Sequence, residues 1–242
     1  MPNRNLRLDL NRLRGAINRH GTLVRIDRAE FCECGSIGSE QTPNYACPDC
    51  NGIGVRFYSP MSTMVLMLSK SSKEMIERYG ILEEGTIGIT IPDIIRDRDT
   101  GELITDYIPA MFDKFTCLRE RIRFSEVLTR GEVHPISGRS KEKAAFLEII
   151  SGTCRITQRG GTIFQEGVDF QIEPDESEYN RKIAWIDGGS SPDPDERYSI
   201  TYQTHPTYLI SPKFLPRHRR EANRMILSHV VAEQVNLVEQ FK

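Results

Sequence analysis

Residues 47–54 read Cys47-Pro-Asp-Cys50-Asn-Gly52-Ile-Gly54, which is the spacing of a zinc knuckle. Two residues between cysteines allow both thiolates to reach one ion at a metal–sulfur distance of about 2.3 Å. A proline after the first cysteine presets the turn, and the two glycines let the backbone bend closely around the sulfur atoms. The stretch therefore predicts a metal-binding turn that organises the chain around it.

A second pair, Cys32 and Cys34, lies upstream with one residue between its members. The twelve residues 35–46 separate the pairs and are long enough to bring all four cysteines to one tetrahedral site. Four thiolates would close the coordination shell of Zn²⁺, so the ion would be structural and would catalyse nothing. Disulfides, a redox dithiol and free thiols are the alternatives. A redox Cys-x-x-Cys normally lies at a strand-to-helix junction, whereas this one precedes glycines and an apolar run.

Composition and length are those of an ordinary globular protein. The 242 residues suffice for one large domain or two to three small ones. No run approaches eighteen apolar residues, so no membrane span and no membrane partner are expected. The first residues lack the apolar core of a signal peptide, which favours a reducing cytoplasm and metal-bound cysteines over disulfides. Cys117 and Cys154 lie in apolar contexts and are expected to be buried.

Charge is distributed unevenly along the chain. Residues 1–30 hold seven Arg against three acidic residues, and residues 213–242 hold six Lys or Arg against three. Residues 31–212 hold 19 basic against 28 acidic residues, a net charge of −9. Basic ends flanking an acidic body indicate contacts with acidic neighbours or phosphates, although solvated helix faces explain them equally well.

Periodicity predicts a mainly β protein with terminal helices. Residues 1–58 are expected to hold an N-terminal helix over 6–19, which Gly21 would end, a short strand over 22–26 and the zinc-knuckle segment. Short strands predict a small β-barrel over 59–135. Strands over 143–150, 153–158, 162–164, 170–172, 182–186 and 198–202 predict an immunoglobulin-like β-sandwich over 136–212, with Trp185 in its core. In the last of these strands, Tyr198, Ile200 and Tyr202 are expected to share one face.

A C-terminal helical arm is expected over 213–242. Its apolar residues recur at helix-compatible spacing, and one end is strongly basic. Such an arm would dock on another subunit as readily as on its own domain. The expected interface residues are Arg217, Arg219, Arg220, Ile226, Val230 and Leu237.

No motif predicts catalysis. The sequence contains no phosphate-binding Gly-rich loop, no dinucleotide fingerprint, no nucleophile elbow and no His-Glu-x-x-His. The five histidines are scattered, and two of them precede prolines. The chain is therefore expected not to be an enzyme.

Several short motifs resemble the neck or head–tail connector proteins of tailed bacteriophages. The tract 164–209 contains Glu166-Gly-Val-Asp169-Phe170, Ile183-Ala-Trp185, a Pro-Asp-Pro-Asp loop and the run from Tyr198 to Tyr208. Three upstream segments support the same resemblance: His20-Gly21-x-x-Val24, the knuckle itself and Val127-Leu-x-Arg-Gly131. In that family such segments form a zinc knuckle, a small β-barrel and an immunoglobulin-like domain.

The resemblance implies a virion structural protein of the phage neck, assembled in the host cytoplasm. Six or twelve copies would form a ring between the portal or its adaptor and the tail terminator or tail tube. Double-stranded DNA would pass through the lumen during packaging and genome ejection, without sequence-specific binding. The acidic middle of the chain suits a lumen that must not grip phosphates, and the basic ends would meet acidic partner surfaces.

Two other functions compete with this one. A zinc-ribbon nucleic-acid-binding protein normally presents Lys and Arg beside its knuckle. Residues 31–54 contain neither, and they include Glu33, Glu40 and Asp49. The other alternative is a different phage virion part, such as a baseplate or collar protein, which sequence barely separates from a neck protein.

Overall fold

The computed structural model describes residues 10–34, 47, 50, 54–69, 86–92, 94–105, 107–133, 135, 138, 140–175, 179–211, 217–221 and 224–234. This part of the chain is mostly β and contains one helix, which confirms the predicted mainly β class. The chain divides into two compact units. The first unit comprises 1–28, 59–119 and 208–233, and the second comprises 29–58, 120–207 and 234–242.

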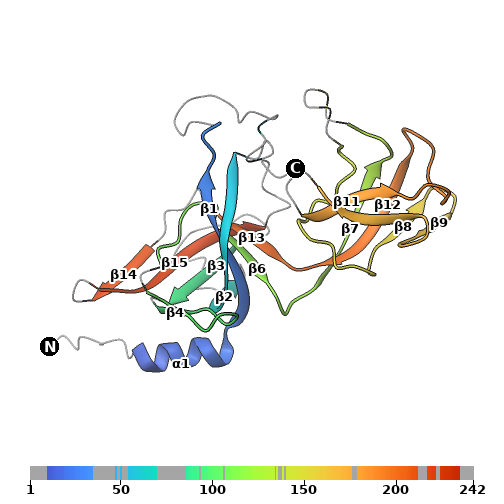
Figure 1. Ribbon diagram of the computed structural model, residues 1–242. Coiled ribbons are helices and arrows are strands. Elements are labelled where there is room, and N and C mark those ends of the chain that lie inside the picture. The colour runs from blue at the N-terminus through green and yellow to red at the C-terminus, as the bar shows by residue number, and fades with distance from the viewer. Residues whose placement is uncertain are drawn as a thin grey trace. The chain divides into compact units, whose positions relative to one another are not determined.

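The elements follow one another along the chain as labelled in Figure 1. They are α1 (Leu10–His20), β1 (Thr22–Phe31), β2 (Val55–Ser69), β3 (Thr86–Pro92), β4 (Ile94–Arg96), β5 (Leu103–Thr105), β6 (Lys114–Cys117), β7 (Ile122–Thr129), β8 (Arg155–Gln158), β9 (Ile163–Gln165), β10 (Phe170–Pro174), β11 (Asn180–Trp185), β12 (Arg197–Thr204), β13 (Thr207–Ile210), β14 (Arg217–Glu221) and β15 (Arg224–Gln234).

A seven-stranded sheet with the order β13-β6-β1-β2-β3-β15-β14 forms the body of the first unit. β13 also pairs with β15, and the Ser211 amide donates to the Val231 carbonyl at 3.0 Å. Six strands therefore form a closed series of pairings, with β14 outside it. Their inward side chains make one apolar core. Its fully enclosed members, at 0% or 1% exposure, are Val24, Ile26, Val65, Ile89, Ile91, Ile95, Phe115, Cys117, Ile210 and Ala232.

A buried ion pair fixes the register of β1 against β6. Asp27 and Lys114 are directly opposite each other in this antiparallel pair. The Lys114 Nζ lies 3.0 Å from Asp27 Oδ2, with side-chain exposures of 3% and 10%. Arg25 Nε also approaches the same oxygen at 3.4 Å. A slip of one residue would leave these charges buried and unpaired, which is strongly unfavourable.

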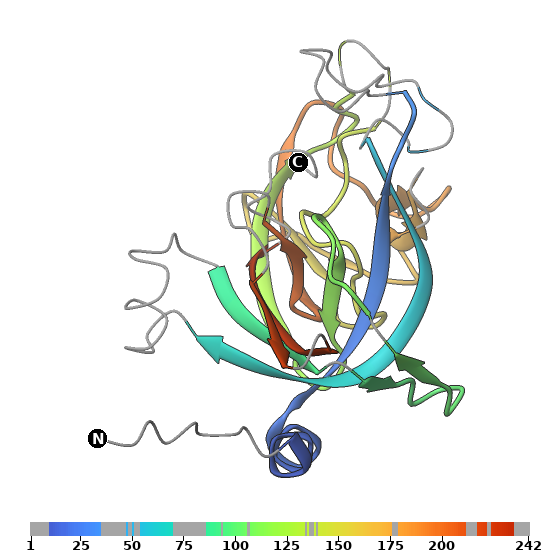
Figure 2. The same cartoon turned by 90° about the vertical axis from the view of Figure 1, so that its left-hand side faces the viewer.

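Helix α1 packs against β2 through a close backbone approach. Ile17 is 2% exposed, and the following Gly21 donates its amide to the Ile17 carbonyl at 2.8 Å. A Cβ at Gly21 would lie 2.4 Å from the Ile17 oxygen and 2.8 Å from the Val65 oxygen. Figure 2 shows α1 end-on beside the strongly curved β2. These two backbone oxygens leave no room for a side chain at position 21, and the glycine ends the helix as the sequence predicts.

The second unit contains a four-stranded sheet, β7-β12-β8-β9, and a two-stranded sheet, β10-β11. Tyr198, Ile200 and Tyr202 alternate on the buried face of β12, as expected from their spacing. Trp185 lies among three aromatic rings, those of Phe164, Phe170 and Tyr198, at centroid distances of 5.3, 5.8 and 5.6 Å. These contacts confirm that the tryptophan belongs to the core of this unit.

Buried carboxylates organise the irregular segments of the second unit. Glu142 Oε1 accepts hydrogen bonds from the Trp185 indole at 2.6 Å and the Tyr198 hydroxyl at 2.7 Å. Its Oε2 accepts from the Gly131 amide at 3.1 Å and from Arg130 at 3.3 Å. Such a fully hydrogen-bonded carboxylate stabilises the loops that reach it.

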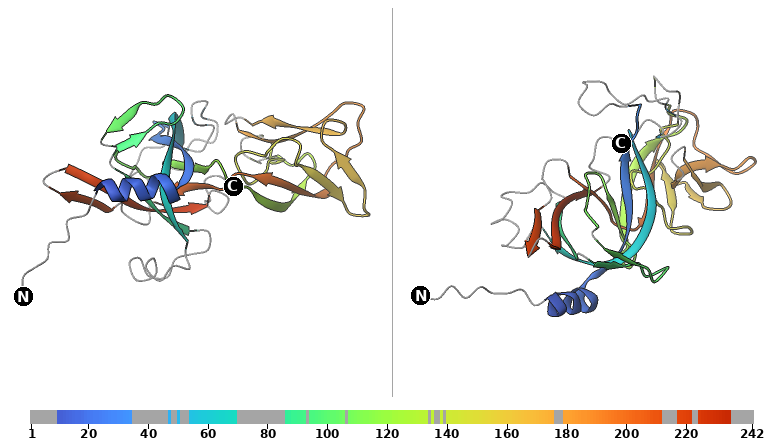
Figure 3. Two further views of the ribbon diagram at one scale, coloured as in Figure 1. Left: turned by 90° about the horizontal axis from the view of Figure 1, so that it is seen from below. Right: turned by 60° about the vertical axis from the view of Figure 1, so that its left-hand side comes forward.

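Two sequence-based predictions are wrong. Residues 143–150 do not form a regular strand but make only single bridges, at Lys143 to Lys182 and Ile149 to Thr204. The C-terminal helical arm over 213–242 is also incorrect, because 217–221 and 224–234 form the hairpin β14–β15. Figure 3, left, shows its two strands side by side. Pairing of β15 with β3 overrides a helical spacing that depended on few residues.

The unit boundaries depart from the four predicted segments. β7, placed with the small barrel of 59–135, pairs with β12 of the second unit. β15, placed in the arm, pairs with β3 of the first unit. Within the described residues, no helix is both long and apolar enough to cross a membrane.

We expect Gly21→Ala to destabilise the first unit by about 2 kcal/mol, because the new methyl group meets two backbone oxygens. The matched control is Gly15→Ala, where the nearest atom to the new Cβ is the far end of Arg19 at 3.7 Å. That change should raise stability by about 0.5–1 kcal/mol, the usual gain inside a helix. Denaturant unfolding of both variants measures the difference, and equal effects would contradict this packing.

Candidate metal centre

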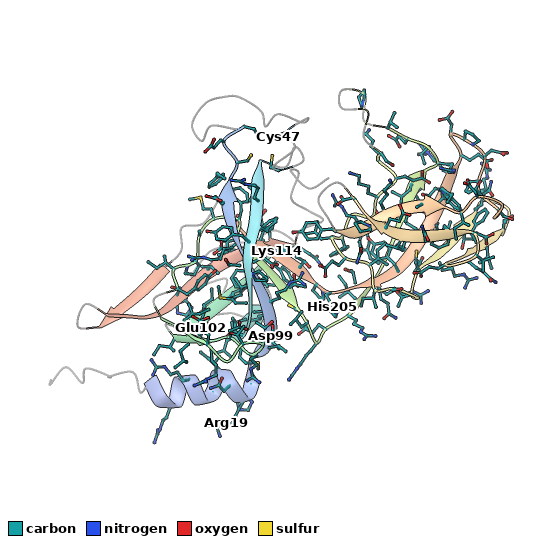
Figure 4. The ribbon with its side chains drawn as sticks, viewed as in Figure 1. Arg19, Cys47, Asp99, Glu102, Lys114 and His205 are labelled. Atoms are coloured by element: carbon teal, nitrogen blue, oxygen red, sulfur yellow. The ribbon has the colours of Figure 1, made fainter. Side chains whose placement is uncertain are left out.

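The two cysteine pairs lie at the adjoining ends of two long strands. β1 ends at Phe31, immediately before Cys32 and Cys34. β2 begins at Val55, shortly after Cys50. Since β1 and β2 are neighbours in the sheet, the end of one lies beside the start of the other. Figure 4 labels Cys47 at this position.

The structure brings all four predicted cysteines together. Their sulfur atoms all lie within 4.8 Å of one another. The Cys32 and Cys47 sulfurs are 3.7 Å apart, and those of Cys34 and Cys50 are 3.3 Å apart. A tetrahedron of thiolates with metal–sulfur bonds of about 2.3 Å has sulfur–sulfur edges of about 3.8 Å. A disulfide would need about 2.05 Å. The four residues therefore fit a single metal ion bound by four thiolates.

Backbone hydrogen bonds hold the two pairs in this arrangement. The Cys32 amide donates to the Gly54 carbonyl at 2.9 Å, which ties the first pair to the second. The Gly54 amide in turn points at the Cys50 sulfur at 3.2 Å. Gly54 has a φ of +80°, which glycine adopts without strain. Such amide–sulfur contacts orient thiolate ligands and stabilise their charge.

Burial shields three of the four cysteines from water. Cys32, Cys47 and Cys50 are 3–4% exposed, and Cys34 is only partly covered. The Cys34 amide lowers the pKa of the Cys32 thiol, but burial and the sulfur contacts with Cys47 and Cys50 outweigh it, so the pKa is raised. A thiol with a raised pKa is a poor nucleophile.

The remaining two cysteines lie elsewhere and are buried, as expected. Cys117 belongs to the core of the first unit, and its sulfur lies 3.5 Å from the Met67 sulfur. Burial and the negative charge of Glu166 raise the pKa of Cys154 to about 12. Both behave as small apolar side chains and contribute no ligand to the cluster.

The predicted interface residues fall on the C-terminal hairpin. Arg217, Arg219 and Arg220 belong to β14, and Ile226 and Val230 to β15. Val230 is 2% exposed and is part of the core of the first unit, which removes it from any contact surface. Leu237 lies outside the described residues. For the others, contact with a partner stays a prediction.

Sequence reasoning identified the four cysteines but missed how they are positioned. It expected a short strand over 22–26 and a loop as the support of the site, whereas β1 and β2 extend to the cysteines from both sides. The mixed apolar and polar character of 55–61 was the available signal.

Comparison with protein-family models and with curated proteins gives no match to this chain.

We expect Cys50→Ser to abolish metal binding and to lower the melting temperature by about 5 °C or more, since three thiolates hold an ion far less tightly than four. Elemental analysis and thermal unfolding of the purified chain measure both effects. Cys154→Ala is the matched control and should retain the metal of the wild type. Equal metal content in wild type and Cys50→Ser would show that this cluster is not the site.

Proposed function

We propose that the cysteine cluster binds one structural Zn²⁺ and that the chain is a virion structural protein of a bacteriophage neck. The observation that carries this proposal is the cluster of four cysteines, whose sulfurs would fill a tetrahedral shell and leave no position for substrate. Four cysteine ligands in a tetrahedron favour zinc over calcium or magnesium, which take oxygen ligands. The site accordingly contributes shape and no catalysis, and the chain is not an enzyme.

The arrangement of strands supports the finer fold assignment. The closed series of six paired strands in the first unit is what a small β-barrel requires. The two sheets of the second unit, with an aromatic core around Trp185, suit an immunoglobulin-like sandwich. Together with the knuckle, these are the three parts that the resemblance to neck proteins implies.

In this proposal, six or twelve copies form a ring between the portal or its adaptor and the tail. Rigid β units suit such a ring, because strands that are distant in sequence pair with one another and fix the shape of each unit. The net acidic segment 31–212 would allow DNA to pass without being held. A nucleic-acid-binding zinc ribbon is less well supported, because Arg56, the first basic residue after the knuckle, is already 3.6 Å from Glu30.

The mass of the native assembly tests this function. We expect native mass spectrometry of the purified chain to give six or twelve times the chain mass of 27.7 kDa, with one zinc per chain. Electron microscopy of the same sample should show a ring with an open lumen. A zinc-loaded monomer that shifts short duplex DNA in a salt-dependent manner would instead support the nucleic-acid-binding alternative.

A further inference from the structure

A pocket of about 330 Å³ in the first unit is not used by the metal centre or by the core. Its lining residues come from α1 and from the segment of the first unit that includes β2, β3, β4 and β5. Its accessible apolar wall comes from Leu103 of β5, which is 53% exposed, and from the half-buried Ile94 of β4, whereas the lining residues Ile17 and Met64 are buried. All of its lining residues belong to the first unit.

Three arginines line this pocket: Arg14 from α1, Arg96 from β4 and Arg98 from the turn that follows. None of the described lining residues is acidic. Asp93 lies between two lining residues in the sequence but outside the described part. In the described structure the Arg96 guanidinium donates to the Gly101 carbonyl at 3.3 Å. The same turn also carries acidic residues: Asp97 is buried and accepts hydrogen bonds from the Ser62 amide and the Thr100 hydroxyl, whereas the exposed Asp99 and Glu102 are not among the lining residues. The guanidinium groups that line the opening are suitable partners for a carboxylate.

The shape of the pocket indicates the kind of anion. A concave site that combines guanidinium groups with an apolar wall fits a short segment bearing carboxylates and apolar atoms. Duplex DNA is a rigid rod that cannot enter such a hollow, and its phosphates are better matched by a row of exposed cations. A protein segment with aspartates beside prolines has the required chemistry.

The chain itself carries such a segment in its second unit. The loop Pro192–Glu196 reads Pro-Asp-Pro-Asp-Glu, and Asp193, Pro194 and Asp195 are exposed. Hydrogen bonds fix its backbone: the Asp195 amide donates to the Arg130 carbonyl at 3.0 Å, and the Glu196 amide to the Asp193 carbonyl at 3.1 Å. Buried Pro192 anchors it further. The two aspartates are therefore presented in a preorganised form, which reduces the entropic cost of binding.

We propose that the Pro192–Glu196 loop of one copy docks in the Arg14–Arg96–Arg98 pocket of a second copy. The contact joins two different surfaces of the same chain, so it is heterologous and generates a ring when the rotation between copies closes. Asp193 and Asp195 pair with Arg96 and Arg98, and Pro194 packs on the apolar wall. This inference rests on the proposed ring and specifies one of its subunit contacts.

Reciprocal charge reversal tests the contact. We expect Arg96→Glu/Arg98→Glu and, separately, Asp193→Lys/Asp195→Lys to weaken self-association at least about tenfold, because like charges then face each other. Mixing the two variants should restore association in mixed assemblies, since each then offers the complement of the other. Wild-type association should also weaken as NaCl increases. Mass photometry and sedimentation velocity of the full-length chain measure all of these.

Arg121→Glu/Arg123→Glu is the matched control, because both arginines are exposed and lie outside the pocket. It should leave association unchanged. An assembly of wild-type mass in both charge-reversed variants would overturn the contact while leaving the ring intact. A wild type that stays monomeric up to its solubility limit would overturn both the ring and the contact. Failure of the mixed variants to associate would show that the two surfaces do not meet.

Discussion

The meeting of four sulfur atoms at the ends of β1 and β2 is the constraint on which the account depends. Residues 32–54 connect these two strands and are poor in large apolar side chains. Such a segment cannot offset its own loss of conformational entropy by burial. In the proposed function, a metal bound by Cys32, Cys34, Cys47 and Cys50 would supply the missing free energy and join the ends of β1 and β2. A closed shell of four thiolates would also leave that ion no position for catalysis.

Part of this architecture could be predicted from local sequence. The cysteine spacing identified the four cysteines that come together, and alternation identified β12 and the buried residues Tyr198, Ile200 and Tyr202. Gly21 was correctly read as the end of α1, although its contact with Val65 could not be foreseen. These successes share one property, which is that the signal lies within a few residues of the feature it describes.

The errors concern pairing between distant segments. β15 pairs with β3, more than one hundred residues upstream, and no periodicity within 224–234 records that partner. The segment was therefore read as a helix from a few apolar residues, although Val230, Val231 and Ala232 are buried in succession, as in a strand covered on both faces. The predicted strand over 143–150 was wrong for a different reason. The segment is largely apolar, as a strand would be, but the Ala145 amide donates to the Glu126 carboxylate and the Phe146 amide to the Tyr202 hydroxyl, where a strand would pair with the backbone of a neighbouring strand.

The distribution of carboxylates separates structural from interactive roles. Glu126, Glu142 and Glu166 accept hydrogen bonds from backbone amides of neighbouring loops, and burial raises the pKa of Glu126. These carboxylates therefore stabilise the loops of their own unit. Asp193 and Asp195 lie exposed on a fixed loop, and the arginine-lined pocket lies in the other unit. In the proposed contact, these aspartates and arginines would be the complementary surfaces that join one copy of the chain to the next.

X-ray absorption at the zinc edge tests the central claim most directly, because it reports the ligands of the ion itself. For the purified chain we predict a shell of four sulfur atoms at about 2.3 Å, with no oxygen or nitrogen neighbour. A shell containing oxygen or nitrogen, or a protein without bound zinc, would contradict a closed four-thiolate site.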